Sequence, residues 1–90
     1  MANTFSLRVI TPAQVVFEGQ ATLVTVVTTE GEEGFFSRHA PFLAALKPGR
    51  LRANVVIDGM SSRLELATSE GFVYALPDRV TVLVEEASSP

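Results

Sequence analysis

Residues 21–36 have the sequence ATLVTVVTTEGEEGFF, and this stretch decides the class of fold. Its first half, 21–28, places apolar side chains on both sides of an extended chain, which is typical of a strand buried on both faces. Its second half contains Gly31 and Gly34, and glycine adopts positive φ at no steric cost. The sequence therefore predicts a strand over 21–28 followed by a turn over 30–34.

Short segments of the same kind lie on both sides of this stretch, separated by turn residues. Val, Ile and Thr are abundant, and their branched side chains suit a pleated surface. No segment shows apolar residues at helical spacing. The predicted strands span 5–9, 15–17, 21–28, 35–36, 42–46, 51–57, 63–68, 72–76 and 80–85. Two antiparallel sheets bury such strands best, so we predict one all-β domain over 1–90, an antiparallel β-sandwich.

Composition excludes several functional classes. The chain has 90 residues, 47% hydrophobic and 19% charged, so it is not predicted to be disordered. A net charge of −3 argues against nucleic-acid binding, which needs a basic face. Cysteine is absent, which excludes disulfides, thiol catalysis and cysteine-ligated metals. The longest uncharged run is far shorter than a membrane span, and no secretory signal is evident, so we expect a soluble intracellular domain.

Few residues carry the pattern of a catalytic or cofactor site. Ser37 lies two positions before His39, the single histidine, but no nucleophile elbow accompanies them. Glu30, Glu32 and Glu33 lack the Asp-rich pattern of a calcium loop. They favour a solvated hairpin tip, or else a charged contact with a basic partner. No catalytic, cofactor or metal site is therefore predicted.

Two further groups of side chains concern the surface. Arg50, Arg52 and Arg63 are expected to share one solvated face across a hairpin. Phe17, Phe35 and Phe36 lie beside predicted turns, so one or two of them could belong to an exposed interaction patch. Together these features favour a binding or structural module over an enzyme.

An ordered series of short motifs points to a family. The motifs are Val9-Ile10-Thr11-Pro12, Val16-Phe17-Glu18-Gly19, Gly31-Glu32-Glu33-Gly34, His39-Ala40-Pro41-Phe42, Leu46-Lys47-Pro48-Gly49, Glu70-Gly71-Phe72, and Val80-Thr81-Val82-Leu83-Val84 with Ala87. Each motif is weak alone, but the order and spacing together are specific. The series closely resembles the amino-terminal domain of the epsilon subunit of F-type ATP synthases, over about residues 4–87.

The resemblance implies a fold and a role. It implies a ten-stranded β-sandwich at the foot of the rotating central stalk, packed on the gamma subunit and resting on the c ring. The domain would help couple proton or sodium transport to ATP synthesis as a non-catalytic rotor part without a cofactor. Its expected location is peripheral, on the cytoplasmic face of a bacterial plasma membrane. Many relatives continue into an inhibitory two-helix domain; this chain stops at Pro90, so neither inhibition nor ATP binding is expected.

The resemblance also implies two contact sets. The c-ring contacts would be Glu30, Gly31, Glu32, Arg38 and His39. The gamma contacts would be Thr11, His39, Leu43 and Ala44. Three departures from the family pattern accompany these residues, one of them the lack of a proline that relatives often have near Thr29. Ser37-Arg38 replaces a frequent Pro-Gly, and Glu70 stands where many relatives have glycine.

Two other functions remain open at this point. One is a free-standing β-sandwich that binds a sugar or peptide, which would need a concave, aromatic-lined pocket. The other is a small hydrolase built around His39, which ranks last.

Overall fold

The computed structural model describes residues 3–90, and it confirms the predicted all-β class. These residues form strands and no helix. The strands are β1 (Phe5–Ile10), β2 (Val15–Thr28), β3 (Gly31–Phe35), β4 (Phe42–Leu46), β5 (Gly49–Ile57), β6 (Met60–Thr68), β7 (Gly71–Leu76), β8 (Arg79–Val84) and β9 (Ala87–Ser88). No helix within 3–90 has the length and apolar character needed to cross a membrane.

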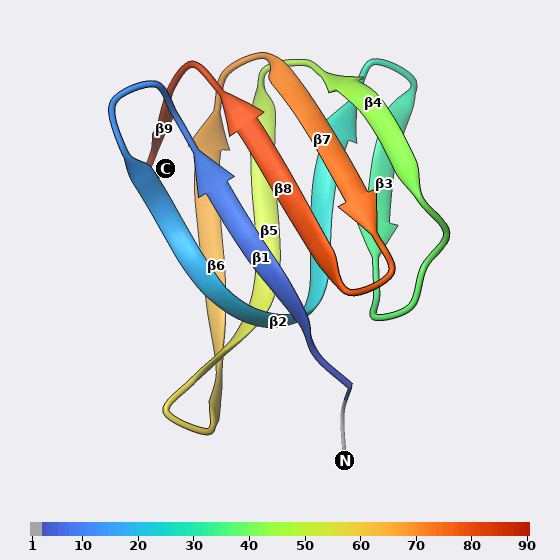
Figure 1. The fold of residues 1–90 in the computed structure, drawn as a ribbon. Helices are drawn as coiled ribbons and strands as arrows, with labels where there is room; N and C mark the ends of the chain where they lie inside the picture. Colours follow the sequence, from blue (N-terminus) through green and yellow to red (C-terminus); the bar gives the residue numbers. More distant parts are fainter. Residues whose placement is uncertain (1–2) are drawn as a thin grey trace.

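The strands form two layers that share one long strand. One layer contains β1, β8, β7 and β4, and the other contains β3, β5, β6 and β9 (Figure 1). β2 joins them, because its first half pairs with β1 and its second half pairs with β3 and β5. We call the first the front layer and the second the back layer, as they appear in Figure 1.

The core lies between these layers and is made by alternation along the strands. In β8, for example, Val80, Val82 and Val84 are buried, whereas the residues between them are not. Successive side chains of a strand point to opposite faces, so each strand contributes every second residue to the core. The largest fully buried side chains are Phe5, Leu7, Leu51, Val9, Val24, Val26, Val55, Val73, Val80 and Val82.

The prediction of a purely antiparallel sandwich was wrong at one place. β1 pairs with β8 in parallel, from Ser6 opposite Arg79 to Ile10 opposite Leu83. Parallel neighbours need a long connection, and here that connection is nearly the whole of the intervening chain. The turn signals in the sequence report pairs of consecutive strands, so they do not reveal this pairing.

The two predicted strands 15–17 and 21–28 are one continuous strand. Gly19 does not end it; the ring of Phe17 lies over Gly19, where a Cβ would be 3.0 Å from Phe17 Cζ. The glycine therefore makes room for an aromatic ring rather than for a turn. A register shift between Ala21 and Leu23 lets β2 pass from the front layer to the back layer.

The turn predicted over 30–34 was misplaced. Thr29 and Glu30 form the turn, and Gly31 already begins β3. Gly31 has a φ of 120°, so the glycine is required, but at the start of a strand. The sequence also missed the short strand β9 and placed the starts of β5 and β6 too late. The Asp58-Gly59 hairpin was predicted correctly; both residues have positive φ, as a type I′ turn requires.

Candidate functional site

The outward side of the front layer carries a row of exposed apolar side chains. Leu43 on β4 lies opposite Tyr74 on β7, and Phe72 on β7 lies opposite Leu83 on β8. All four are exposed, Leu43 most strongly at 68%. We call these four residues the apolar face. Large apolar side chains gathered on one exposed face mark an interaction site in a small protein.

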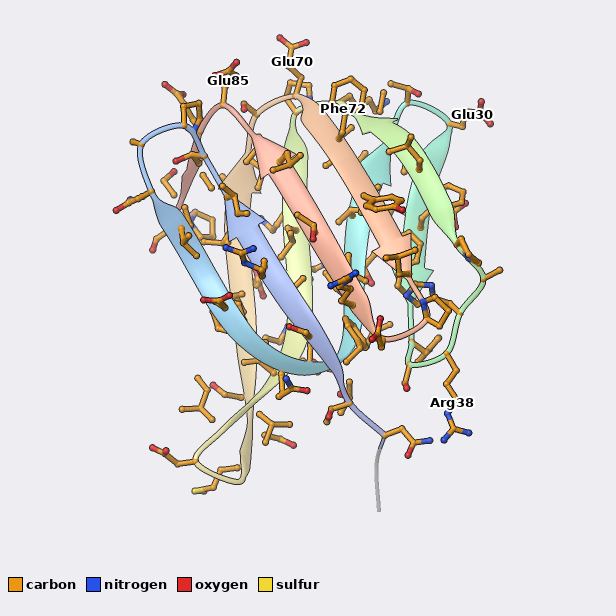
Figure 2. All side chains as sticks on the ribbon, viewed as in Figure 1. Glu30, Arg38, Glu70, Phe72 and Glu85 are labelled. Carbon is orange, nitrogen blue, oxygen red and sulfur yellow. The ribbon has the colours of Figure 1, made fainter. Side chains whose placement is uncertain are left out.

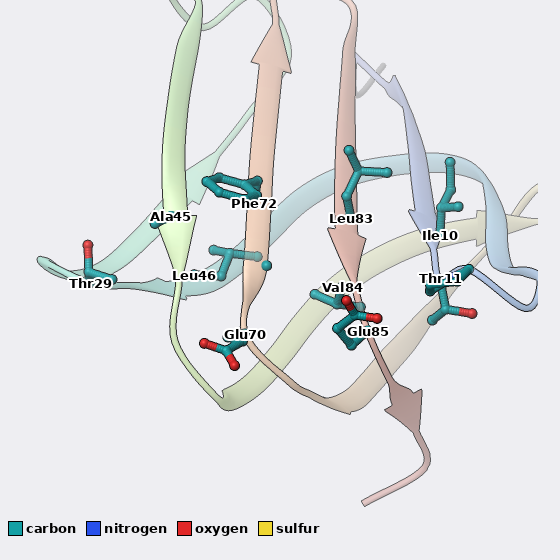
Figure 3. A pocket seen from close by; sticks show the side chains of 12 residues that line it. Ile10, Thr11, Thr29, Ala45, Leu46, Glu70, Phe72, Leu83, Val84 and Glu85 are labelled. Atoms are coloured by element: carbon teal, nitrogen blue, oxygen red, sulfur yellow. The ribbon is translucent and has the colours of Figure 1, made fainter.

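A groove continues the apolar face toward one end of the sandwich. It has a volume of about 660 Å³ and is lined mainly by apolar side chains from β1, β4, β7 and β8 (Figure 3). Phe72 and Leu83 belong both to the apolar face and to the groove. Glu70 and Glu85 stand at its rim (Figure 3). We call this hollow the end groove.

The turn between β2 and β3 lies at the same end and is built on a buried threonine. Thr28 is only 3% exposed. Its hydroxyl donates to the carbonyl oxygen of Gly31 at 2.7 Å and accepts from the backbone N–H of Glu30 at 3.1 Å. Because both groups next to the turn are fixed in this way, the Glu30 carboxylate is held out into solvent.

The outward side of the back layer is polar and paired by charge. Arg52 Nη2 lies 3.0 Å from Glu32 Oε2. Glu65 lies between Arg50 and Arg63, at 3.6 Å and 3.4 Å. We call these five residues the polar face. The prediction that the three arginines share one solvated face is confirmed, and each of them has a carboxylate partner.

The two ends of the sandwich differ in charge. Glu30, Glu70 and Glu85 project from one end, and Arg38 projects from the opposite end (Figure 2). Arg38 has a φ of 66°, a left-handed conformation that favours glycine. Its backbone N–H donates to the carbonyl oxygen of Pro77 at 2.7 Å, which fixes that conformation.

His39 lies partly inside the sandwich rather than on an open surface. Its ring meets Phe35 edge-on at 5.2 Å and Phe5 at 6.3 Å between centroids. Nδ1 lies 3.0 Å from the carbonyl oxygen of Ala40, whereas Nε2 is buried and has no hydrogen-bond partner within residues 3–90. Within residues 3–90, no hydrogen bond joins His39 to Ser37, and the His39 ring packs against Phe5 and Phe35.

The described residues offer no candidate metal centre. Within residues 3–90, no three His, Asp or Glu side chains converge closely enough to hold a metal ion. The candidate functional site is the surface made of the apolar face, the end groove and the turn between β2 and β3 that carries Glu30, which we call the acidic turn.

Comparison with known proteins identifies the family. The family described as "ATP synthase, Delta/Epsilon chain, beta-sandwich domain" matches residues 4–90, which is nearly the whole chain. The chain belongs to this family.

The curated relatives that the chain resembles are named ATP synthase epsilon chain. The ATP synthase epsilon chain of Ruminiclostridium cellulolyticum is 36% identical over 87 residues, covering 97% of this chain and 62% of the relative. That of Halalkalibacterium halodurans is 41% identical over 88 residues, with 97% and 62% covered. The chain thus spans less than two thirds of the length of these relatives.

Solved structures of ATP synthases contain the same fold. A chain of the Euglena gracilis mitochondrial ATP synthase superposes with a TM-score of 0.84 at 22% identity, covering 94% of this chain and 52% of that one. A chain of the Tetrahymena thermophila mitochondrial ATP synthase, central stalk and c ring, gives 0.76 at 17% identity, with 97% and 67% covered. At sequence identities this low, the structural similarity shows a shared fold.

The gamma contacts expected from the delta/epsilon family do not all share one surface. Leu43 lies on the apolar face and Thr11 lines the end groove. Ala44 packs against the core and His39 packs against Phe5 and Phe35. The expected c-ring contacts are also divided: Glu30, Gly31 and Glu32 belong to the turn and β3, and Arg38 projects from the far end (Figure 2).

Sequence reasoning missed three of the four residues of the apolar face, namely Phe72, Tyr74 and Leu83, and most of the residues that line the end groove. The signal was present in the alternation of 72–76 and 80–85, whose apolar side chains occur on both faces of their strands. One face of each strand packs in the core. Apolar residues on the opposite face indicate an exposed apolar surface, which the sequence alone could have revealed.

Proposed function

We propose that this chain is the β-sandwich part of an ATP synthase epsilon chain and acts as a structural part of the rotor. In this role it binds the gamma subunit and the polar loops of the c ring, and it helps couple proton or sodium transport to ATP synthesis. The observation that carries the proposal is an unpartnered apolar face on a domain of the delta/epsilon family.

The apolar face supports the gamma contact. Interfaces have a desolvated centre of aromatic and aliphatic side chains with a polar rim. Leu43, Phe72, Tyr74 and Leu83 provide such a centre, and they stand on a rigid sheet whose inner side is the core. Binding to them requires no rearrangement of the strands. Leu43 is therefore retained from the expected gamma contacts, and its three neighbours are added.

The acidic turn supports the c-ring contact. Glu30 is exposed at the turn, and Glu33 follows on an exposed strand. An acidic tip suits a ring of basic loops, because complementary charge sets orientation and speeds encounter. Glu32 would reach such a partner after exchanging its ion pair with Arg52. Arg38 stands at the opposite end, so the acidic end and not Arg38 is proposed to face the ring (Figure 2).

A free-standing ligand-binding module is the alternative role. It would use the end groove, whose single aromatic side chain is Phe72. An aromatic-lined cavity is the usual sign of a sugar or peptide site, and one ring at the edge of a groove is a poor match to it. Membership of the delta/epsilon family also favours the rotor role.

The location follows from the proposed complex. As part of a rotor bound to a c ring, the chain would be peripheral to the membrane, on the side where gamma lies. For a bacterial relative, that side is the cytoplasmic face of the plasma membrane.

A co-elution experiment tests the proposal. The chain is mixed with the purified gamma subunit of the same organism and analysed by size-exclusion chromatography with light scattering. We expect a one-to-one complex. Elution of the folded chain apart from gamma would contradict the proposal. Membranes that contain the c ring and gamma should then retain the wild type more strongly than Glu32→Lys.

A further inference from the structure

The tip of the β5–β6 hairpin projects beyond the body of the sandwich (Figure 1). Asp58 and Gly59 form its two-residue turn, between Ile57 at the end of β5 and Met60 at the start of β6. All four residues are exposed, Met60 by 72%. Ile57 and Met60 pair with each other, and no third strand within residues 3–90 pairs with either of them. The tip can therefore open locally while the core stays packed.

The turn carries its backbone strain at Asp58. Asp58 has a φ of 52° and Gly59 has a φ of 79°. Glycine adopts this left-handed region freely, whereas a residue with a Cβ does so at a cost in free energy. Gly59 itself is open to solvent, because a Cβ added there would meet no atom within 4 Å apart from its neighbours in sequence. The backbone of the turn is thus strained on one side of the Asp58–Gly59 peptide bond and uncovered on the other.

An aspartate followed by a glycine can rearrange without an enzyme. The backbone nitrogen of Gly59 attacks the side-chain carboxyl carbon of Asp58; a C–N bond forms, a C–O bond breaks, and the oxygen leaves as water together with the amide hydrogen. Water then adds to the main-chain carbonyl carbon of the resulting cyclic imide and cleaves the bond from that carbon to nitrogen. The chain now continues through the side chain of Asp58, as isoaspartate with a free α-carboxylate. One water is lost and one is regained, so the mass is unchanged and no reagent is consumed.

The other aspartate of the chain provides an internal comparison. Asp78 also lies in a turn, between β7 and β8, but Arg79 follows it. A side chain on the following residue crowds the attacking nitrogen, and glycine has none. The carbonyl oxygen of Asp78 also accepts the backbone N–H of Ser6 at 3.0 Å, which ties this turn to β1. The two aspartates therefore differ both in the access to the attacking nitrogen and in the freedom of the turn.

We propose that Asp58–Gly59 is a site of spontaneous isomerisation to isoaspartate, and that the reaction uses the locally open state of the hairpin tip. The closed turn fixes the backbone torsions of both residues, so attack on the carboxyl carbon needs the opening that the exposed tip permits. The product has one more carbon in the main chain, which a two-residue turn does not accommodate. The Ile57–Met60 pair is therefore lost, whereas the pairs nearer the core remain because β2 also pairs with β5. This modification is independent of the rotor role.

Prolonged incubation of the folded chain at neutral pH tests the proposal. Isoaspartate is located by digestion and mass spectrometry after labelling with a protein isoaspartate methyltransferase and S-adenosylmethionine. We expect about tenfold more isoaspartate at Asp58 than at Asp78, because exposed loop tips are the most mobile points of a fold. The matched variant is Gly59→Asn, since asparagine tolerates positive φ and keeps the turn while its side chain crowds the nitrogen; the yield at Asp58 should fall about tenfold. Thermal unfolding checks that this variant keeps the fold.

Two further measurements concern the open state and the product. The chain unfolded in guanidinium should react at Asp58 about threefold to tenfold faster than the folded chain, because its tip is always open. In the isomerised chain, separated by ion exchange, amide exchange should be faster at Met60 and unchanged at Val73. Equal isoaspartate at Asp58 and Asp78 in the folded chain, or an unchanged yield in Gly59→Asn, would overturn the proposal. An unfolded chain that reacts no faster, or exchange at Met60 that isomerisation leaves unchanged, would contradict it as well.

Discussion

The two outward faces of the sandwich have the same strand geometry and opposite chemistry. On the polar face, each arginine has a carboxylate within 4 Å, so its charges are matched within the chain. On the apolar face, four large side chains are exposed, and within residues 3–90 the nearby carboxylates of Glu70 and Glu85 form no ion pair. A face whose groups are already paired gains little from a partner. The difference between the two faces supports the proposal that the apolar face makes the main contact with a partner.

The largest loss of stability is expected from adding a methyl group to a glycine of the front layer. At Gly71, a Cβ would overlap the carbonyl oxygen of Leu83 on the neighbouring strand. Because that atom belongs to the backbone, Gly71→Ala must separate β7 from β8. We expect a loss of about 3 kcal/mol in the free energy of unfolding, measured by urea denaturation.

A glycine in the back layer provides the control for this variant. A Cβ at Gly34 would meet Leu23 Cδ1 at 3.6 Å, which is ordinary contact. Gly34→Ala should leave stability unchanged or raise it by about 0.5 kcal/mol. Equal losses for Gly71→Ala and Gly34→Ala would show that the close approach of β7 to β8 is not a constraint.

The next effect concerns binding by the apolar face. Leu43→Asp places a charge at the proposed centre of the gamma interface, where it would be desolvated. We expect the dissociation constant for gamma to rise about a hundredfold, or about 2.7 kcal/mol. Met60→Asp is the matched control, because Met60 is exposed at 72% but lies on the β5–β6 hairpin. If both variants lost gamma binding to a similar extent, the apolar face would not be the gamma-binding site.

A smaller effect is expected inside the acidic turn. Thr28→Val keeps the shape of the side chain but leaves the N–H of Glu30 and the carbonyl of Gly31 without their partner. We expect a loss of about 1–2 kcal/mol in stability and faster amide exchange at Glu30. Thr25→Val, on the outward side of the same strand, should change stability by less than about 0.5 kcal/mol. Unchanged exchange at Glu30 would contradict this account of the turn.

The smallest effect belongs to the polar face. A double-mutant cycle on Arg52→Ala and Glu32→Ala should give a coupling energy of about 0.5 kcal/mol, since the Glu32 side chain is exposed and that of Arg52 is partly exposed. The coupling should vanish at about 1 M salt. A coupling above about 1.5 kcal/mol would mean that the polar face contributes to stability as strongly as an interior contact.

Local sequence patterns predicted most strands and one hairpin, but they did not predict which distant strands pair. Alternation and turn residues located nearly all the strands, and Asp58-Gly59 gave the correct hairpin, because these features depend on neighbours in sequence. Gly19 and Gly31 were misinterpreted because a glycine can serve an aromatic ring or a strand end as well as a turn. The parallel pairing of β1 with β8 joins opposite ends of the chain, and no local signal encodes it.

The candidate site was predictable by motif more than by geometry. Glu30 and Leu43 follow from the resemblance to the epsilon family and are exposed in the structure. The separation of Glu30 from Arg38 was not predictable, because the length of β3 and the path of the following loop set it (Figure 2). Ala44 was expected to contact gamma because of its place in the resemblance. Strand alternation turns it toward the core, on the side opposite to Leu43, and this could have been noticed because 42–46 was predicted as a strand.

The parallel pairing of β1 with β8 also has a consequence for biosynthesis. β1 is synthesised before β8, and β2 soon pairs with one edge of β1. The other edge of β1 stays unpaired until β8 is synthesised, roughly 70 residues later, and closing the long loop between these two strands is slow. Until then β1 presents an open edge to other nascent chains, which invites strand exchange and aggregation. The interval between the synthesis of β1 and that of β8 is therefore the period in which the unfinished sandwich is most exposed to aggregation.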